Sequence, residues 1–215
     1  MARAAQRPGT DVLVIDVAPV TDREPTTLDA HERNRLARLR RTADRARYLA
    51  AHVRLRELLA EVTGRPPADL RFSQADCPAC GKAHGRPVLT DHPDVHFSLA
   101  HAGSRIAVAI AAAPVGIDVE ALTSVPGEPE LSTVIRHLHP REVAELQALP
   151  AHERGPAFLA CWTRKEAWRK GVGTGIAIGL DADVVGVHRP VSPAGWTVAD
   201  LDAGAGHSAA LAVRT

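Results

Sequence analysis

The sequence predicts an α+β fold of two similar halves, because a helix followed by a strand hairpin occurs twice along the chain. In the first occurrence, apolar residues recur at helical spacing over residues 42–63, and a hairpin pattern follows over 96–112. In the second, a helical segment over residues 157–170 precedes a hairpin pattern over 196–213. Two such halves should meet near residues 112–120, and we expect the active site in the cleft between them.

The N-terminal half is expected over residues 11–112. A valine-rich apolar run over residues 11–20 is typical of a strand. The helix over residues 42–63 should end at the Gly-Arg-Pro-Pro segment that follows it. Short strands are expected at residues 70–72 and 88–89, on either side of a loop rich in Cys, Gly and Pro.

The C-terminal half is expected over residues 113–215. It opens on a strand over residues 115–120, at the end of a run so apolar that it should be buried. Helices are expected over residues 142–149 and 157–170, and glycines from Gly171 onward should break the second of them.

Composition and charge place the chain among ordinary globular proteins. Of its 215 residues, 45% are hydrophobic and 24% are charged, and a formal net charge of +1 argues against nucleic-acid binding. The longest apolar run, residues 106–117, contains Pro114 and is too short to cross a bilayer. Residues 1–10 lack the apolar core of a signal peptide, so we expect a loose N-terminal tail and a cytoplasmic protein with no membrane partner. Three cysteines do not make a disulfide framework.

Two charge patterns point to chemistry. Asp118 and Glu120 lie two residues apart in the expected strand, so their side chains share one face. Glu166 and Lys170 lie four residues apart in the expected helix and are neighbours on its surface. Each pair alone is more typical of a solvated surface, but together they supply three acidic oxygen donors and a cation. This set predicts a site for a hard divalent ion, most naturally magnesium, and for a phosphorylated substrate.

Several basic side chains are candidates for holding phosphate. His101 follows an expected strand and precedes a turn glycine, and Arg86 lies in a Gly-Arg-Pro loop. Nine arginines but only two acids occur over residues 31–56, so one or two of them could reach an anionic ligand while the others form a solvated face.

Cys77, Cys80 and His84 have the spacing of half a zinc site. A structural zinc ion needs four ligands, and His92 or His96 could supply the fourth. A loop of reduced cysteines without metal is an equally good interpretation of the pattern.

Three segments occur in an order and spacing that resemble the Sfp-type 4′-phosphopantetheinyl transferases: residues 97–103 (FSLAHAG), 115–120 (VGIDVE) and 162–170 (WTRKEAWRK). Residues 85–89 resemble the Gly-Lys-Pro segment of that family, and residues 33–59 resemble its first basic helix. The resemblance covers roughly residues 10–215. It implies two pseudo-symmetric α+β halves with coenzyme A bound between them.

The resemblance also implies roles for the acidic residues. Asp118, Glu120 and Glu166 match the family's metal ligands, for Mg²⁺ or alternatively Mn²⁺. Glu166 also matches the base that takes the proton of the acceptor serine, and Lys170 matches the lysine that assists departure of 3′,5′-ADP. The matching activity is transfer of phosphopantetheine to an acyl or peptidyl carrier protein, as in polyketide and nonribosomal peptide biosynthesis.

By the same resemblance, His101, Arg86 and Arg35 match the residues that hold the nucleotide phosphates. The family usually has hydroxyl side chains on both sides of the histidine, whereas this chain has Ala100 and Ala102. Hydroxyl contacts to phosphate are therefore lost at these two positions.

Two other functions compete with this interpretation. Acids on a strand with Glu and Lys on a helix also occur in metal-dependent phosphodiesterases and nucleases, although the balanced charge argues against a polynucleotide substrate. A non-catalytic module that binds carrier protein or zinc is the second alternative. Because one chain can build the whole cleft, a monomer would be sufficient.

Overall fold

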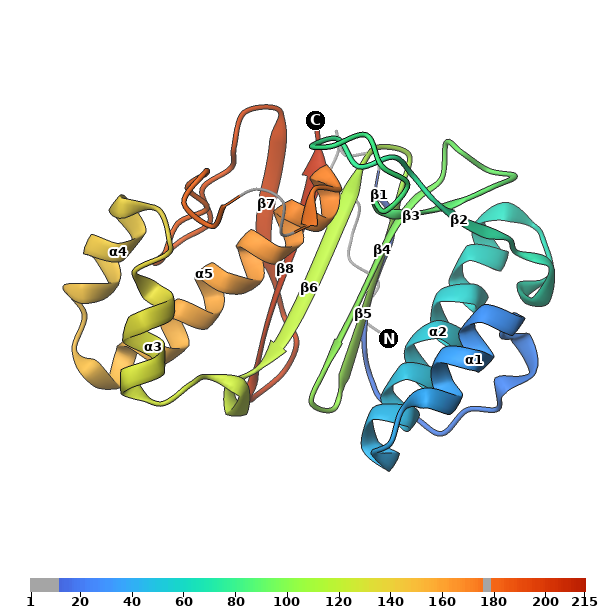
Figure 1. Ribbon diagram of the computed structural model, residues 1–215, viewed down its shortest axis with the longest axis horizontal. Helices are drawn as coiled ribbons and strands as arrows, with labels where there is room; N and C mark the ends of the chain where they lie inside the picture. The colour runs from blue at the N-terminus through green and yellow to red at the C-terminus, as the bar shows by residue number, and fades with distance from the viewer. Residues whose placement is uncertain (1–11, 176–178) are drawn as a thin grey trace.

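The computed structural model describes residues 12–175 and 179–215, and the expected tail over residues 1–10 lies outside them. Within these residues, two three-stranded antiparallel sheets lie at the centre of the molecule (Figure 1). The first sheet has the order β1-β5-β4 and contains β1 (Val12–Pro19), β4 (His96–Ala102) and β5 (Arg105–Ala111). The second has the order β6-β8-β7 and contains β6 (Val115–Ala121), β7 (Trp196–Leu201) and β8 (His207–Arg214).

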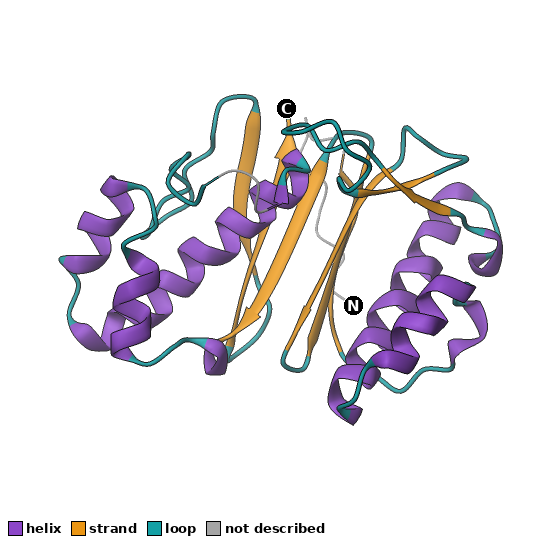
Figure 2. Cartoon of the chain, viewed as in Figure 1, coloured by secondary structure: helices purple, strands orange, loops and turns teal. Residues whose placement is uncertain are grey.

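The two halves repeat one topology. In each, a strand is followed by a long helix and then by a hairpin whose second strand pairs with the first strand of that half. The long helices are α2 (Thr42–Thr63) and α5 (Ala151–Val172), and each has 22 residues and ends at a glycine in the left-handed conformation. The helices cover the outer faces of the sheets on opposite sides (Figure 2). The predicted α+β fold of two similar halves is thus confirmed.

Shorter elements complete each half. The first half contains η1 (Pro25–Thr27), α1 (Ala30–Arg38), η2 (Pro67–Asp69) and a small sheet of β2 (Phe72–Gln74) and β3 (Pro87–Leu89). The second contains η3 (Leu122–Ser124), α3 (Glu128–Ile135) and α4 (Pro140–Gln147). The sequence predicted α4 two residues late, and it did not predict α3. The expected boundary between residues 112 and 113 lies in the connection between β5 and β6.

One shared core joins the halves. The inner faces of β5, β6 and β8 are built from alanine, valine, isoleucine and leucine side chains that pack together across the two sheets. At the adjoining edges, the hydroxyl oxygen of Ser98 on β4 accepts a hydrogen bond from the backbone N–H of Ile117 on β6 at 3.0 Å. The sheets therefore hold β4 and β6, which carry the candidate residues, beside each other. No helix in the described part of the chain has the length and apolar character needed to cross a membrane.

Two glycines bring α5 close to β6. A Cβ atom on Gly116 of β6 would lie 1.9 Å from the backbone oxygen of Ala167, and a Cβ atom on Gly171 would lie 2.6 Å from the ring of Trp196. Gly171 was expected to break the helix but lies inside α5, because its lack of a side chain serves this close contact. The result is that the acids of β6 and of α5 face the same space.

Candidate functional site

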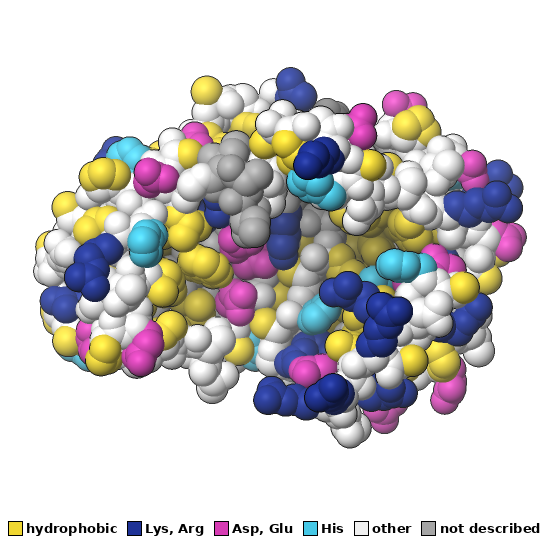
Figure 3. Space-filling model, viewed as in Figure 1, with side chains coloured by type: hydrophobic (Ala, Val, Ile, Leu, Met, Phe, Trp, Pro, Cys, Tyr) yellow, Lys and Arg dark blue, Asp and Glu magenta, His cyan; other side chains and the backbone are white. Residues whose placement is uncertain are grey.

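A cavity of about 1690 Å³ lies between the two halves. Its lining comes from α1, α2 and the end of β4 in the first half, and from β6, η3, the turn that follows α3, and α5 in the second. Figure 3 shows this face, where acidic and basic side chains adjoin in the central hollow and further Lys and Arg side chains gather over the first half. Because carboxylates and cationic side chains meet in one cavity, it suits a ligand that carries phosphate together with a cation.

Asp118 and Lys170 meet in this cavity. The ammonium group of Lys170 donates to Oδ1 of Asp118 at 2.6 Å, which joins α5 to β6. Asp118 is only 4% exposed, and burial raises its pKa to about 6 although Lys170 opposes the shift. The charges of Glu120 and Glu166 raise it further, so these three carboxylates lie close enough to repel one another.

The three predicted acids fit a hard divalent cation. Oδ2 of Asp118 is buried and has no hydrogen-bond partner among the described residues. Glu120 lies partly buried on β6 and Glu166 partly buried on α5, and burial raises the pKa of Glu120 as well. Carboxylate oxygens are the donors that Mg²⁺ prefers, and a cation would relieve the repulsion among them. The oxygen atoms of the three acids do not all lie within 4.8 Å of one another, and Lys170 compensates the charge of Asp118 directly.

Ion pairs made by the buried side chains of Arg164 and Lys165 fix the orientation of α5. Lys165 contacts Oε2 of Glu142 on α4 at 2.6 Å, and Arg164 donates from two nitrogens to both carboxylate oxygens of Asp200 on β7. Neither Lys165 nor Arg164 lines the cavity. The neighbouring Glu166 and Lys170 are thereby presented to the cavity.

His101 and Arg35 lie on the basic side of the same cavity. His101 is exposed toward the cavity, but the protein atoms packed around it lower its pKa to about 4, and the charges of His52, Arg47 and Lys170 act in the same direction. Arg35 is an exposed residue of α1 at the rim. Both predicted phosphate contacts are therefore brought near the acidic cluster.

Arg86 lies outside this main cavity. Its guanidinium donates to the backbone oxygen of Gly171 at 3.1 Å and to Nδ1 of His96 at 3.1 Å. It lines a smaller neighbouring cavity of about 540 Å³, whose lining includes Lys170 and Arg169 of α5. Since these two residues also line the main cavity, Arg86 is adjacent to the site without facing it in this structure.

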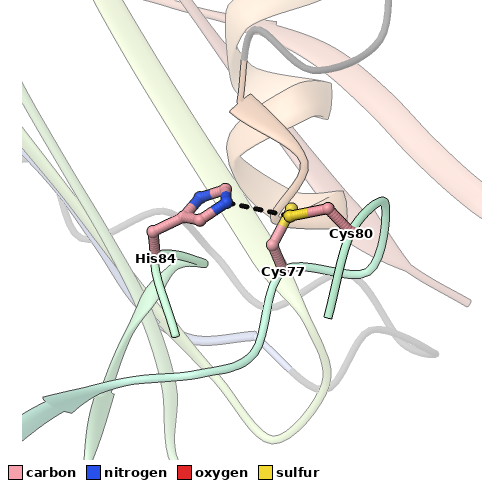
Figure 4. Close-up of side chains that lie close together, drawn as sticks. All are labelled: Cys77, Cys80 and His84. Carbon is pink, nitrogen blue, oxygen red and sulfur yellow. Dashed lines mark hydrogen bonds between the residues drawn. The ribbon is translucent and has the colours of Figure 1, made fainter. Parts of the chain in front are cut away.

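Cys77, Cys80 and His84 also come together. Their ligand atoms lie within 4.8 Å of one another, and Nε2 of His84 is 2.9 Å from the sulfur of Cys80 (Figure 4). The backbone N–H groups of Ala79 and Cys80 lower the pKa of the Cys77 thiol. Neither His92 nor His96, the suggested fourth ligands, belongs to this group in the described residues.

The sequence did not identify several residues of the site. Arg47 lines the cavity and donates to the backbone oxygen of Gly103 at 3.0 Å, and His52 lines it while pairing with Glu32 at 2.9 Å. Both lie in the arginine-rich segment, where no spacing distinguishes a ligand contact from a solvated side chain. Arg169 was also missed, although its place one turn after Glu166 could have indicated it.

Comparison with known proteins gives a consistent result. Residues 114–209 match the model of the 4′-phosphopantetheinyl transferase superfamily. A 4′-phosphopantetheinyl transferase of Bacillus subtilis is 29% identical over 161 residues, which cover 75% of this chain and 67% of that protein. The transferase Sfp of Bacillus subtilis strain 168 is 26% identical over 75% of this chain and 67% of its own length. A putative 4′-phosphopantetheinyl transferase of Synechocystis is 30% identical over 72% of this chain and 60% of its own length.

Proposed function

We propose, because this chain belongs to the 4′-phosphopantetheinyl transferase superfamily, that it transfers phosphopantetheine from coenzyme A to a serine of an apo acyl or peptidyl carrier protein. The observation that carries the proposal is the pairing of Asp118 with Lys170 beside Glu120 and Glu166, in a cavity that both halves line. This arrangement brings carboxylate ligands for a metal ion next to the ammonium group of Lys170, which can contact phosphate.

Asp118, Glu120 and Glu166 would hold the magnesium ion that this reaction requires, and the ion would neutralise charge on the pyrophosphate of coenzyme A. Glu166 accepts the proton of the carrier serine, directly or through water, as the serine oxygen bonds to the β-phosphorus. The bond from that phosphorus to the bridging oxygen breaks, and 3′,5′-ADP leaves with the electron pair. Lys170 balances the charge that develops on the departing phosphate.

The basic wall of the first half would bind the nucleotide part of coenzyme A. His101, Arg35 and Arg47 line this side of the cavity. Ala100 and Ala102 offer no hydroxyl groups, so backbone N–H groups and these side chains must supply the donors to phosphate. Arg86 contributes from the neighbouring cavity, where it contacts the backbone of α5.

The two competing functions are not retained. The relatives reported above are phosphopantetheinyl transferases by name, which favours neither a nuclease nor a non-catalytic module. The proposed reaction uses coenzyme A, Mg²⁺ and a serine of the carrier, and a monomer carries it out.

Incubation of the protein with coenzyme A, Mg²⁺ and several apo carrier proteins tests this function. Intact-mass spectrometry should show a gain of one phosphopantetheine on the carrier, and the gain should disappear without Mg²⁺. A carrier variant with alanine in place of its acceptor serine is the control and should stay unmodified. No gain with any carrier, from a protein whose circular dichroism shows it to be folded, would contradict the proposal.

A further inference from the structure

The cluster of Cys77, Cys80 and His84 lies outside the machinery of the proposed reaction. Its two sulfur atoms and one imidazole nitrogen converge within 4.8 Å of one another (Figure 4). Two thiolates and a neutral imidazole are the ligands that zinc prefers in proteins. Carboxylates, which would favour magnesium or calcium, do not belong to this cluster of described residues.

The backbone of the loop arranges these ligands. The N–H of Gly81 donates to the oxygen of Cys77 at 2.7 Å, and Gly81 takes a left-handed φ of 69° that closes the turn. The N–H groups of Cys77 and His84 both donate to the oxygen of Lys82, at 2.8 and 2.7 Å. Backbone hydrogen bonds therefore hold the three ligands in position before any ion binds, which lowers the cost of binding.

The loop buries little apolar surface. Of residues 76–84, Cys77 alone is buried, and the loop joins two strands of three residues each. At its base, the N–H of Ala75 donates to the oxygen of Arg86, and the N–H of Gly85 donates to the oxygen of Ala75. A loop with so little apolar burial is the kind of segment that a metal ion stabilises in small domains.

We propose that Cys77, Cys80 and His84 bind a zinc ion, with water in the fourth coordination position. The two available histidines nearby do not join them, since Nδ1 of His96 accepts from Arg86 and His92 lies outside the cluster. Zinc is four-coordinate, and where the protein supplies three ligands, as in catalytic zinc sites, a water molecule occupies the fourth position.

The zinc ion would restrain the loop that leads to Arg86. His84 lies two residues before Arg86, whose guanidinium reaches the backbone of α5 at Gly171. Fixing His84 therefore fixes the segment that brings Arg86 to the edge of the site. This consequence rests on the proposed function, because it assumes that coenzyme A binds there.

Cobalt substitution tests the metal site without reference to activity. The reduced protein should bind one equivalent of Co²⁺ with thiolate-to-cobalt charge-transfer bands and the d–d bands of four-coordinate cobalt. Cys80→Ser and His84→Ala, both at exposed positions, should bind zinc roughly 100-fold more weakly or worse in competition with a chromophoric chelator. His152 lies on α5 with a side chain that is 81% exposed. His152→Ala is the matched control and should bind zinc with the affinity of the unmodified protein.

Three results would overturn the metal site: no cobalt bands in reduced protein, unchanged zinc affinity of Cys80→Ser, or a Cys77–Cys80 disulfide in the native protein.

Calorimetric titration of coenzyme A in excess Mg²⁺, with and without a zinc-selective chelator, tests whether the zinc ion positions Arg86. Zinc removal should weaken binding roughly tenfold, the size of the loss of one hydrogen bond to a charged group, and Arg86→Ala should bind weakly whether zinc is present or not. If the affinity for coenzyme A were unchanged by zinc removal, the zinc ion would not position Arg86. If neither the zinc-bound nor the zinc-free protein bound coenzyme A, the proposed function would be refuted and the zinc site would stand.

Discussion

Asp118 has a charge at a position from which water is nearly excluded. Its Oδ1 is satisfied by Lys170, whereas its Oδ2 is buried without a partner among the described residues. Leaving a buried carboxylate oxygen unpaired is unfavourable, and a bound cation would satisfy this one. This single atom is the strongest residue-level indication of a cation in the site.

Replacing Glu166 by Gln should lower kcat roughly 10²- to 10⁴-fold, because the amide cannot accept the proton of the carrier serine. The side chain is partly exposed in the cavity, so the fold should be unaffected. The measurement is the initial rate of carrier modification by mass spectrometry. Glu145→Gln, on α4 in an exposed ion pair with Arg141, is the matched control. Equal rates for both variants would rule out Glu166 as the base.

His101 should titrate near pH 4 in the free protein, because burial and nearby cations lower its pKa from 6.5. The unfolded chain then binds more protons than the native protein between about pH 4 and 6.5, so this residue makes the free energy of unfolding rise with pH in that interval. NMR of the imidazole Cε1–H signal measures the pKa directly, with His101→Gln identifying the signal.

Bound phosphate should raise the pKa of His101, because an adjacent negative charge favours the imidazolium. Coenzyme A should therefore move the titration of the same Cε1–H signal to higher pH. A signal that already titrates near 6.5 without ligand, or that does not move when coenzyme A binds, would contradict the role of His101 as a phosphate contact.

Among the elements, the long helices and the hairpins could be predicted from the sequence because their apolar periodicity spans many residues. Helix α1 was not predicted from its residues. Its start is fixed by a capping box in which Asp29 and Glu32 bond each other's backbone N–H groups, a signal carried by two side chains rather than by periodicity. The end of α5 was placed too early because glycine usually ends a helix. At Gly171 the helix continues, since contact with β6 and Trp196 requires the missing side chain.

The contact between α5 and β6 should be lost in Gly116→Ala. The added methyl would lie 1.9 Å from the oxygen of Ala167 and 2.4 Å from the nitrogen of Gly171, so the helix and strand must separate. We expect a loss of about 1 to 3 kcal/mol in the free energy of unfolding and a larger loss of activity, because the contact between Asp118 and Lys170 spans these two elements.

Urea unfolding and the transferase rate measure both effects of Gly116→Ala. Gly127→Ala is the control, since its methyl would approach only the end of the Glu130 side chain, at 3.4 Å. If Gly116→Ala had the same stability and activity as the unmodified protein, the close packing of α5 on β6 would not be what positions the site.

At the scale of the molecule, the repeated pattern predicted that the acids would lie at the junction of two halves. It could not predict the pairs that orient them. Lys165 and Glu142 are 23 residues apart, and Arg164 and Asp200 are 36 apart, so only the tertiary fold reveals that they meet. The sequence likewise grouped Arg86 with the phosphate contacts, whereas the fold places it in the neighbouring cavity.

An exposed arginine at the opening of the cavity suggests where a carrier protein approaches. Arg136, at the end of α3, is exposed and lines the opening on the side of the acidic cluster. If the carrier presents an acidic helix, Arg136→Glu should lower kcat/KM for the carrier roughly tenfold at low salt through weaker steering. The affinity for coenzyme A should be unchanged, because charge at the rim acts mainly on the encounter between the two proteins.

Steady-state rates over a range of salt concentrations distinguish this effect from a local disturbance. Salt screens charges in water, so the difference between Arg136→Glu and the unmodified protein should shrink as the ionic strength rises. Arg189→Glu, an exposed arginine that does not line the cavity, makes the same change in net charge and should have little effect. An equal loss in both variants would indicate that net charge, rather than the position of Arg136 at the opening, governs carrier association.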